Sequence, residues 1–311
     1  MKSTAKAIVS HRRGLAGTAQ RKQGKVAHLF LLPWLLGLVL ITLVPLAASL
    51  YLSFTDYNLL SSPNFIGLGN FSEMFSDVRF WHAVVVTIKY VLISVPLQLA
   101  FALLLAMVLD KGFHGTSFYR SAFYLPSLLG SSVALAIIWR QIFGSDGIVN
   151  SILSVIGIGG TNWLQNPATA LDTLVVLNVW TFGSPMIIFL AGLRQIPREM
   201  HESAEVDGAG PVRKFRSITI PLLSPLIFFN LVLQTINAFQ AFTQASVVSR
   251  GTGGPVDSTL FYTLYLYQQA FLNYQMGYAS AMAWVLLVVV GLITAGHFFA
   301  SKYWVFYSDG S

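Results

Sequence analysis

The sequence predicts an all-α integral membrane protein with six transmembrane helices. The chain is 55% hydrophobic and only 10% charged, with a mean hydropathy of +0.65, whereas soluble domains average about 25% charged residues. Crossing the hydrocarbon core of a bilayer takes about 20 residues of helix. Apolar runs of that length recur six times along the chain, and short polar or turn-rich segments separate them.

The composition excludes several classes of function. The chain has no cysteine, so disulfides, thiolate catalysis and zinc–thiolate sites are ruled out. Its six histidines are scattered without metal-ligand spacing, so we expect no metal site. The formal net charge of +7 borders apolar spans, where positive charge sets topology. We therefore expect a lipid bilayer and not nucleic acid as the surroundings of this chain.

The chain begins with a basic tail, residues 1–27, which holds seven Lys or Arg and no acid. A signal peptide is the alternative, but the apolar run that follows is too long and lacks a small-residue cleavage site. The predicted transmembrane domain covers 28–304, and a short tail, 305–311, ends the chain. The six predicted spans within that domain are 28–54, 81–109, 121–143, 171–193, 220–248 and 276–304.

Residues at the ends of the spans support these limits. Asp110-Lys111-Gly112 ends the second span and Gly144 closes the third, because charge and glycine both disfavour continuation of a helix in lipid. Pro185 lies inside the fourth span and is expected to kink it.

The distribution of basic residues predicts the topology. Six spans place both termini on one side of the membrane, and fifteen of the 19 Lys and Arg residues fall on that side. The opposite side has Arg79 and Arg250, with Arg140 near the same edge. Since positive residues are retained in the cytoplasm, both termini and the 194–219 connection are expected to be cytoplasmic.

The 194–219 connection has the pattern of a helix-turn-helix. Four of the 12 acidic residues lie within nine positions of it. Pro197 suits the start of a helix that runs to about Val206, Gly208 breaks this helix, and Pro211 starts a second helix that runs through Ile218. Small residues at 203, 204 and 208–210 would allow another surface to approach the backbone closely. The alternative is an ordinary loop helix that packs on its own protein.

These residues carry a resemblance to a known family. The pattern Glu202-Ser203-Ala204-x-x-Asp207-Gly208-Ala209, followed by Phe215 and by a Pro-Leu-Leu-x-Pro segment at 221–225, resembles the EAA loop of the membrane subunits of bacterial ABC importers. The variant is similar to that of the maltose-type carbohydrate permeases, although Ser203 stands where they usually have alanine. FIGLGNF at 65–71, TGGP at 252–255 and MGYASA at 276–281 also resemble that family, so the similarity covers about 28–304.

The resemblance implies a fold, a site and partners. It implies six transmembrane helices with a cytoplasmic EAA coupling helix-turn-helix between spans four and five, in the bacterial cytoplasmic membrane. The residues that it implies for docking to the ATPase are Met200, Glu202, Ser203, Ala204, Asp207, Gly208, Ala209 and Phe215.

The partners that the resemblance implies are two cytoplasmic ATPase subunits, a second related permease that completes a heterodimer, and an extracytoplasmic solute-binding protein. This chain has no Walker A motif. We therefore expect it to bind no cofactor and to be no enzyme itself, with ATP and Mg²⁺ held by the partner ATPase.

Amides in the fifth span are the main candidates for a substrate pathway. Asn230, Gln234, Asn237 and Gln244 follow one another at helical spacing, and Gln240 lies close by. Polar residues inside a membrane face the interior of the bundle or a cavity, and an amide both donates and accepts hydrogen bonds, as sugar hydroxyls do. The alternative is that these amides bond neighbouring helices together. The further candidates are Lys89, Tyr90 and Gln98 in span two, Asn178 in span four and Trp284 in span six.

The alternatives to a sugar importer differ in the residues that they need. A membrane-embedded enzyme would need a cluster of His, Asp or Glu at a membrane edge, and a stand-alone secondary transporter usually has a carboxylate within a span. The sequence shows neither feature. An importer of glycerol 3-phosphate or a related polyol phosphate would need cationic partners. The cationic candidates within the spans are only Lys89 and Arg140, and Arg140 is expected to be an interface anchor. A neutral sugar is therefore favoured.

Overall fold

A computed structural model describes residues 30–112, 115–130 and 132–306 of the chain. Within these residues the regular structure is helical, apart from one isolated antiparallel bridge between Thr55 and Phe65. The predicted basic tail, 1–27, lies outside the described residues, as do the last five residues of the predicted C-terminal tail.

Among the described residues, four helices are long and apolar enough to cross a membrane, and two bent helix pairs bring the number of possible spans to as many as six. The segment Phe30–Leu52 contains η1 (Leu38–Leu43) and α2 (Val44–Leu52), and Val78–Asp110 is α4. Pro211–Phe239 is built from α11 (Pro211–Lys214), η2 (Phe215–Thr219) and α12 (Ile220–Phe239), and Met276–Ser301 is α15.

The predicted third span, 121–143, is not one continuous helix. The chain forms α5 (Thr116–Leu129) and α6 (Val133–Ile142), which meet at an angle of 100°. The Oγ of Ser132 accepts a hydrogen bond from the backbone N–H of Leu135 at 3.1 Å and so caps the start of α6. Hydropathy alone did not reveal this turn, because both helices are apolar.

The predicted fourth span, 171–193, is also broken. It consists of α8 (Ala170–Trp180) and α9 (Gly183–Leu193), bent by 42°. The break falls at Thr181 and Phe182, ahead of Pro185, so the proline is not the site of the kink. At Gly183 a Cβ atom would clash with the backbone oxygen of Phe123 and lie 2.8 Å from the Cα of Tyr124. The glycine therefore lets the start of α9 pass directly against α5.

The predicted fifth span, 220–248, differs from the structure at both ends. The helix stops at Phe239, and a separate short helix, α13 (Thr243–Val248), follows. At its other end the span is longer than expected, because the helix that begins at Pro211 does not stop at Ile218 but continues into α12. The preceding helix, α10 (Arg198–Val206), ends at the expected residue, and Gly208 after it has the left-handed φ of +75°.

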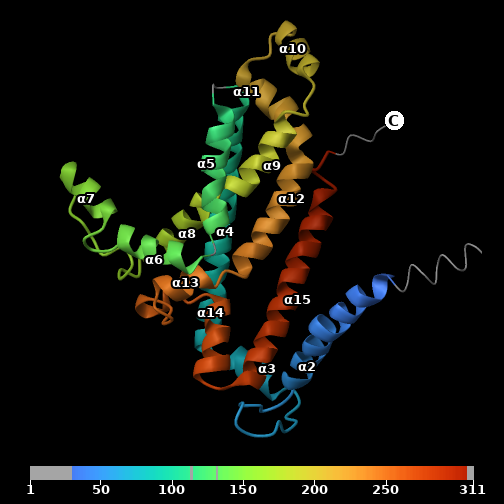
Figure 1. The fold of residues 1–311 in the computed structure, drawn as a ribbon, viewed down its shortest axis with the longest axis vertical. Helices are drawn as coiled ribbons and strands as arrows, with labels where there is room; N and C mark the ends of the chain where they lie inside the picture. The colour runs from blue at the N-terminus through green and yellow to red at the C-terminus, as the bar shows by residue number, and fades with distance from the viewer. Residues whose placement is uncertain (1–29, 113–114, 131, 307–311) are drawn as a thin grey trace, which may run out of the picture.

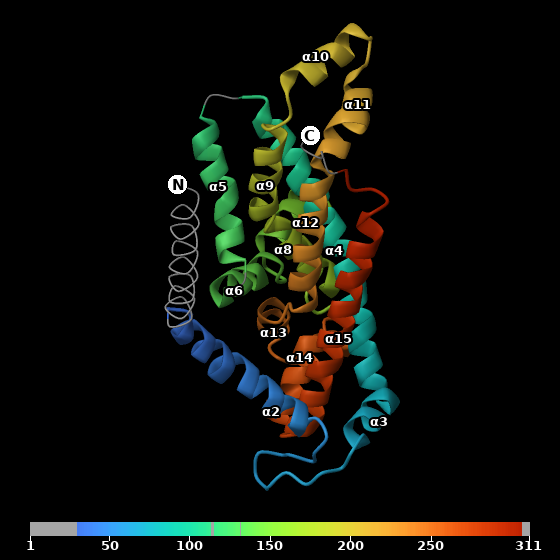
Figure 2. The same ribbon diagram turned by 90° about the vertical axis from the view of Figure 1, so that its right-hand side faces the viewer.

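The elements form an elongated bundle with α10 at one end (Figure 1). Near the opposite end lie α3 (Gly69–Ser76) and α14 (Tyr262–Tyr267), the latter continued by η4 (Gln268–Leu272). The helix that contains α2 lies at the side of the bundle (Figure 2) and packs on α15. The short helix α7 (Ile148–Val155) projects sideways beyond α6 (Figure 1), and η3 (Pro255–Asp257) belongs to the loop between α13 and α14.

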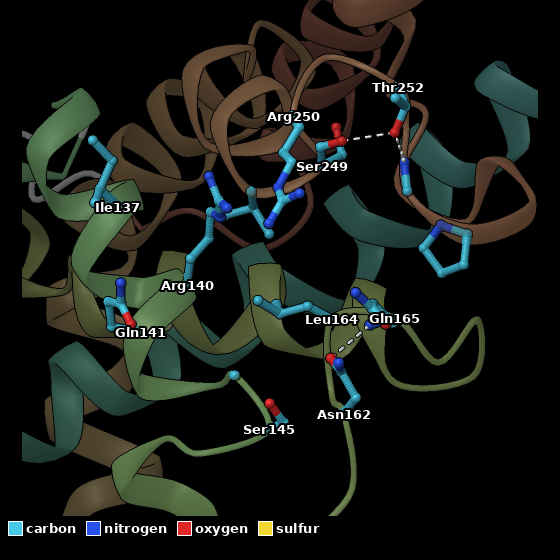
Figure 3. Close-up of a pocket in the computed structure, with 14 residues that line it drawn as sticks. Ile137, Arg140, Gln141, Ser145, Asn162, Leu164, Gln165, Ser249, Arg250 and Thr252 are labelled. Atoms are coloured by element: carbon cyan, nitrogen blue, oxygen red, sulfur yellow. Dashed lines mark hydrogen bonds between the residues drawn. The ribbon is translucent and has the colours of Figure 1, made fainter.

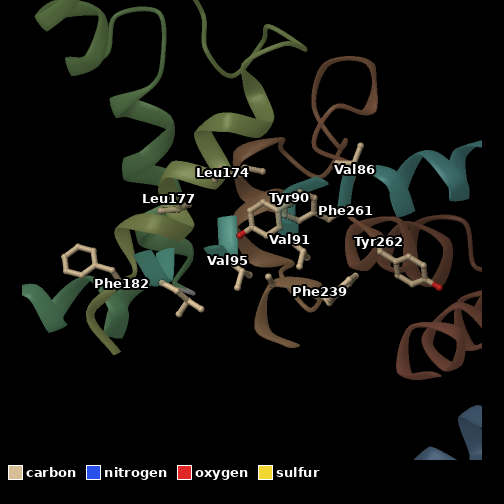
Figure 4. Packing of buried hydrophobic residues seen from close by; sticks show 14 of the residues in the cluster. Val86, Tyr90, Val91, Val95, Leu174, Leu177, Phe182, Phe239, Phe261 and Tyr262 are labelled. Atoms are coloured by element: carbon tan, nitrogen blue, oxygen red, sulfur yellow. The ribbon is translucent and has the colours of Figure 1, made fainter. Parts of the chain in front are cut away.

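The core is built around α4, which packs against α8, α9, α12 and α14. Its buried face includes Val86, Tyr90 and Val95, and these residues meet apolar side chains of the other helices (Figure 4). The ring of Tyr90 lies 4.5 Å from that of Phe261, measured between centroids. A single central helix thus contacts both halves of the broken fourth span and the helix that carries the predicted amide stripe, whereas α5 packs on α9 and α6 packs on α13.

The contact at Gly183 gives a first prediction. Gly183→Ala should lower the thermal unfolding midpoint of the detergent-solubilised protein, because forcing extra atoms into a packed site costs about 1–3 kcal/mol. The matched control is Gly291→Ala, in the middle of α15, where a Cβ atom would have no neighbour within 4 Å. That variant should be neutral or stabilising, by up to ~1 kcal/mol. Equal midpoints for Gly183→Ala and the wild type would contradict the close approach of α5 and α9.

Candidate functional site

A cavity of about 520 Å³ lies between α4, α9, α12, α13 and the breaks of the two bent helix pairs. We call it the amide cavity, because amide side chains dominate its polar lining. The residues that line it are Tyr90, Gln98, Ser127, Gly130, Asn178, Thr181, Ser184, Ile188, Asn230, Leu233, Gln234, Asn237, Gln240, Ala241, Phe242, Thr243 and Gln244.

Eight of the ten residues that the sequence assigns to the substrate pathway line this cavity. Asn230, Gln234 and Asn237 come from one face of α12, and Asn178 comes from α8. The sequence placed Gln244 on the same helix as the other amides, but it belongs to α13. The turn between α12 and α13 nevertheless keeps Gln244 at the same cavity, together with Gln240 at the end of α12.

Two of the predicted pathway residues do not line the cavity. Lys89 is exposed, although the next residue, Tyr90, lines it. Successive residues of a helix are rotated by about 100°, so these two side chains leave α4 in different directions. Trp284 is half-buried on α15, and this helix contributes no residue to the lining.

Several polar side chains of the cavity hold the broken helices together. The amide N–H of Gln98 donates to the backbone oxygen and to the Oγ1 of Thr181, at 3.2 and 3.0 Å, and its Oε1 accepts from Asn178 at 3.3 Å. The hydroxyl of Ser127 donates to the same Thr181 oxygen at 2.8 Å. At the other break, Gln244 donates to the backbone oxygen of Gly130 at 2.8 Å. These bonds satisfy carbonyl groups that a helix break leaves without a helical partner.

The remaining amides have unused hydrogen-bonding capacity. Among the described residues, the side chains of Gln234, Asn237 and Gln240 make no hydrogen bond within the chain. Asn230 is completely buried, and its side-chain N–H donates to the backbone oxygen of Leu226 at 2.9 Å. Its Oδ1 has no partner in the described part of the chain. A buried polar atom without a partner is costly, so this group of amides is suited to a polar ligand.

Sequence reasoning missed the contribution of the helix breaks to this cavity. Ser127, Gly130 and Ser184 line it only because the two spans are interrupted beside them. The available signals were Pro126 and Gly130 within the predicted third span and Gly183 within the fourth. Inside an apolar run such residues indicate a break only when another helix approaches, which the sequence does not show.

The chain matches a known family over most of its length. Residues 66–301 match the profile of the family described as "Binding-protein-dependent transport system inner membrane component". The chain belongs to this family. It is therefore a multi-pass membrane component of a transport system, and it is an ABC transporter permease, not an enzyme.

Two relatives illustrate the match. The chain is 54% identical to the probable ABC transporter permease protein YesP of Bacillus subtilis (strain 168), over 93% of this chain and 94% of that protein. It is 33% identical to the probable starch degradation products transport system permease protein AmyD of Thermoanaerobacterium thermosulfurigenes, over 88% of this chain and 92% of that protein.

A solved structure shows the same fold. It is the crystal structure of a bacterial alginate ABC transporter in complex with an alginate pentasaccharide-bound periplasmic protein. The TM-score is 0.79 at 21% sequence identity, and the alignment covers 91% of this chain and 96% of that chain. The all-helical architecture described above is thus that of an ABC importer permease.

The division between bonded and unbonded amides gives a second prediction. Gln98→Leu should destabilise the protein by about 1–3 kcal/mol, because it leaves buried polar partners at the α8–α9 break unsatisfied. Gln234→Leu removes a side chain that makes no bond and should change stability by less than ~0.5 kcal/mol. Thermal unfolding in detergent would compare the two variants. Equal losses of stability would show that this division is wrong.

Proposed function

We propose that this chain is the membrane-spanning permease subunit of an ATP-driven importer of a sugar, either a monosaccharide or an oligosaccharide. An extracytoplasmic solute-binding protein delivers the sugar. The protein lies in the bacterial cytoplasmic membrane with both termini in the cytoplasm. The observation that carries this proposal is the amide cavity, in which Gln234, Asn237, Gln240 and the Oδ1 of Asn230 have no partner among the described residues.

The chemistry of the cavity suits a sugar. Each free amide can donate to one hydroxyl and accept from another, and Phe242 in the wall offers an aromatic face for the apolar side of a sugar ring. The volume of about 520 Å³ falls in the range of roughly 300–1,000 Å³ that is usual for small-molecule sites. The transport of starch degradation products by a relative supports the same substrate class.

A polyol phosphate, such as glycerol 3-phosphate, is the second candidate for the solute. A phosphate binds where Arg or Lys side chains can pair with it. Among the described residues that line the amide cavity there is no Lys, Arg or His. The lining of this cavity therefore favours the hydroxyl groups of a sugar.

The proposed docking element for the ATPase is the hairpin of α10 and α11. It stands at one end of the molecule (Figure 1), and Met200 on α10 is 43% exposed. Lys214 and Glu205 form an ion pair of 3.3 Å between its two helices. The remaining proposed docking residues are Glu202, Ser203, Ala204, Asp207, Gly208, Ala209 and Phe215. ATP and Mg²⁺ are then bound by two partner ATPase subunits, and a second permease completes a heterodimer.

The hairpin is mechanically connected to the amide cavity. The helix that starts at Pro211 runs without interruption to Phe239, and its second half carries Asn230, Gln234 and Asn237. A displacement of α10 by the ATPase is therefore transmitted along one helix to the residues that face the solute. Coupling between two sites requires such an element whose position both of them bias.

Reconstitution of the whole importer tests the proposed function. The chain, purified with its partner permease and ATPase in proteoliposomes, should take up sugar only when ATP and the loaded binding protein are both present. Gln234→Leu with Asn237→Leu should lower uptake at least ~10-fold, the equivalent of 1.4 kcal/mol, while the ATPase still binds. Robust transport by this chain purified alone would contradict the proposal, and unchanged uptake by the double variant would make these amides structural.

Substitution of Gly208 tests the coupling role of the hairpin. Gly208→Val places a β-branched residue at a φ of +75°, which is strained for any residue with a Cβ atom. We expect uptake to fall and ATP hydrolysis to become uncoupled from it, while the two permease subunits still assemble. Gly210→Ala is the matched control, because its φ is −69° and a Cβ atom there has no neighbour within 4 Å. Normal uptake by Gly208→Val would refute the coupling role.

A further inference from the structure

A second and larger cavity, of about 840 Å³, lies between the end of α6, the 144–165 segment and the loop that follows α13. We call it the arginine pocket (Figure 3). Its lining consists of Ile137, Arg140, Gln141, Gly144, Ser145, Asn162, Leu164, Gln165, Val248, Ser249, Arg250, Thr252, Gly254 and Pro255. No acidic residue of the described part of the chain belongs to this lining.

Two arginines face each other across this pocket. Arg140 lies in the last turn of α6, and Arg250 follows α13 with a φ of +55°. Their side chains extend into the same space (Figure 3). Neither forms an ion pair with any residue in the described part of the chain. Like charges that are held close together repel each other, so the pocket favours a ligand that brings negative charge.

Arg79 shows the contrasting case within the same part of the molecule. It forms an ion pair of 2.8 Å with Asp257, and its hydrogen bond holds the pKa of that carboxyl below the ordinary value, although partial burial acts in the opposite direction. The positive charge of Arg79 is therefore neutralised within the chain. No described residue neutralises the charges of Arg140 and Arg250, so these charges are available to a ligand.

The rest of the lining suits a ligand with several hydroxyl groups. The side chains of Gln141 and Gln165 line the pocket and make no hydrogen bond among the described residues. Asn162 accepts from the backbone N–H of Gln165 at 3.2 Å, which leaves its amide N–H free to donate. Amides flanking a pair of guanidinium groups offer both partners that an acidic sugar needs. Guanidinium binds a carboxylate through two parallel hydrogen bonds, and amides bind hydroxyls.

The arginine pocket and the amide cavity share two structural elements. Thr243 and Gln244, at the start of α13, line the amide cavity, and Val248 at its end lines the arginine pocket. The helix α6 packs on α13 and follows Gly130, which lines the amide cavity. A helix of six residues is only about 9 Å long at 1.5 Å per residue. The two cavities therefore lie close to each other, at the two ends of one short helix.

We infer that the arginine pocket binds the carboxylate of an acidic oligosaccharide, the solute that this chain carries. The inference rests on the proposed function and specifies its substrate class. It replaces two expectations from the sequence, namely that the solute is a neutral sugar and that Arg140 is an interface anchor. Both expectations considered only the positive residues inside the predicted spans. The second guanidinium, Arg250, comes from a loop. The volume of about 840 Å³ and the amides spread around the pocket fit an oligosaccharide better than a small polyol phosphate.

The test is direct binding to the intact complex without its solute-binding protein, so that the specificity of that protein does not enter. The complex, embedded in nanodiscs, is titrated with three probes: a trisaccharide that carries one uronate, its carboxyl-reduced neutral counterpart, and glycerol 3-phosphate. The uronate trisaccharide should bind at least ~10-fold more tightly than the neutral one, the equivalent of 1.4 kcal/mol. Arg140→Gln with Arg250→Gln should remove this difference and leave the affinity for the neutral trisaccharide within ~2-fold.

The control removes two positive charges elsewhere, by Lys111→Gln at the end of α4 with Arg120→Gln in α5, and should preserve the preference for the acidic probe. Equal affinity of the wild type for the two trisaccharides, or a preference that survives the pocket variant, would overturn the inference. Tighter binding of glycerol 3-phosphate would assign the arginines to phosphate instead. Failure of both trisaccharides to bind would also overturn it, and the reconstituted uptake assay then shows whether the sugar importer itself stands.

Discussion

The structure depends on how backbone groups are satisfied where membrane helices are interrupted. A carbonyl without a helical partner has no water to bond within the hydrocarbon core. The Thr181 oxygen at the α8–α9 break accepts from both Gln98 and Ser127, and the Gly130 oxygen at the α5–α6 break accepts from Gln244. Because these donors come from other helices, the same bonds that repair the breaks also fix the positions of α4, α5 and α13 around the amide cavity.

Interrupting the helices also creates the space that a solute occupies. Two uninterrupted helices in place of the bent pairs would present packed faces at these positions, whereas the breaks open a cavity of about 520 Å³ in the middle of the bundle. The cost of each break is offset locally by a side-chain hydrogen bond. The amides on α12 that are not used for this purpose remain available, so structural and binding roles are divided among neighbouring residues of the same type.

In contrast to the two bent pairs, the segment from Pro211 to Phe239 is one continuous helix. It joins the hairpin of α10 and α11 to the amide cavity. A broken helix there would absorb a displacement of the hairpin before it reached Asn230 or Asn237. The contrast between this continuous helix and the broken pairs around it is what the proposed coupling between ATPase and solute requires.

The sequence by itself determined that the chain is a multi-pass helical membrane protein, because long apolar runs and scarce charge have no other stable solution in lipid. It also determined that amides at helical spacing gather on one face of α12, and its motifs indicated the importer family. Only the tertiary structure decided where the helices break, because Gly183 and Gly130 matter only when a neighbouring helix passes close to them. Likewise, Arg140 and Arg250 are 110 residues apart in the sequence and share one pocket only because α6 packs on α13. Hydropathy and periodicity are local properties of a chain, whereas a cavity and its charge are set by contacts between distant segments.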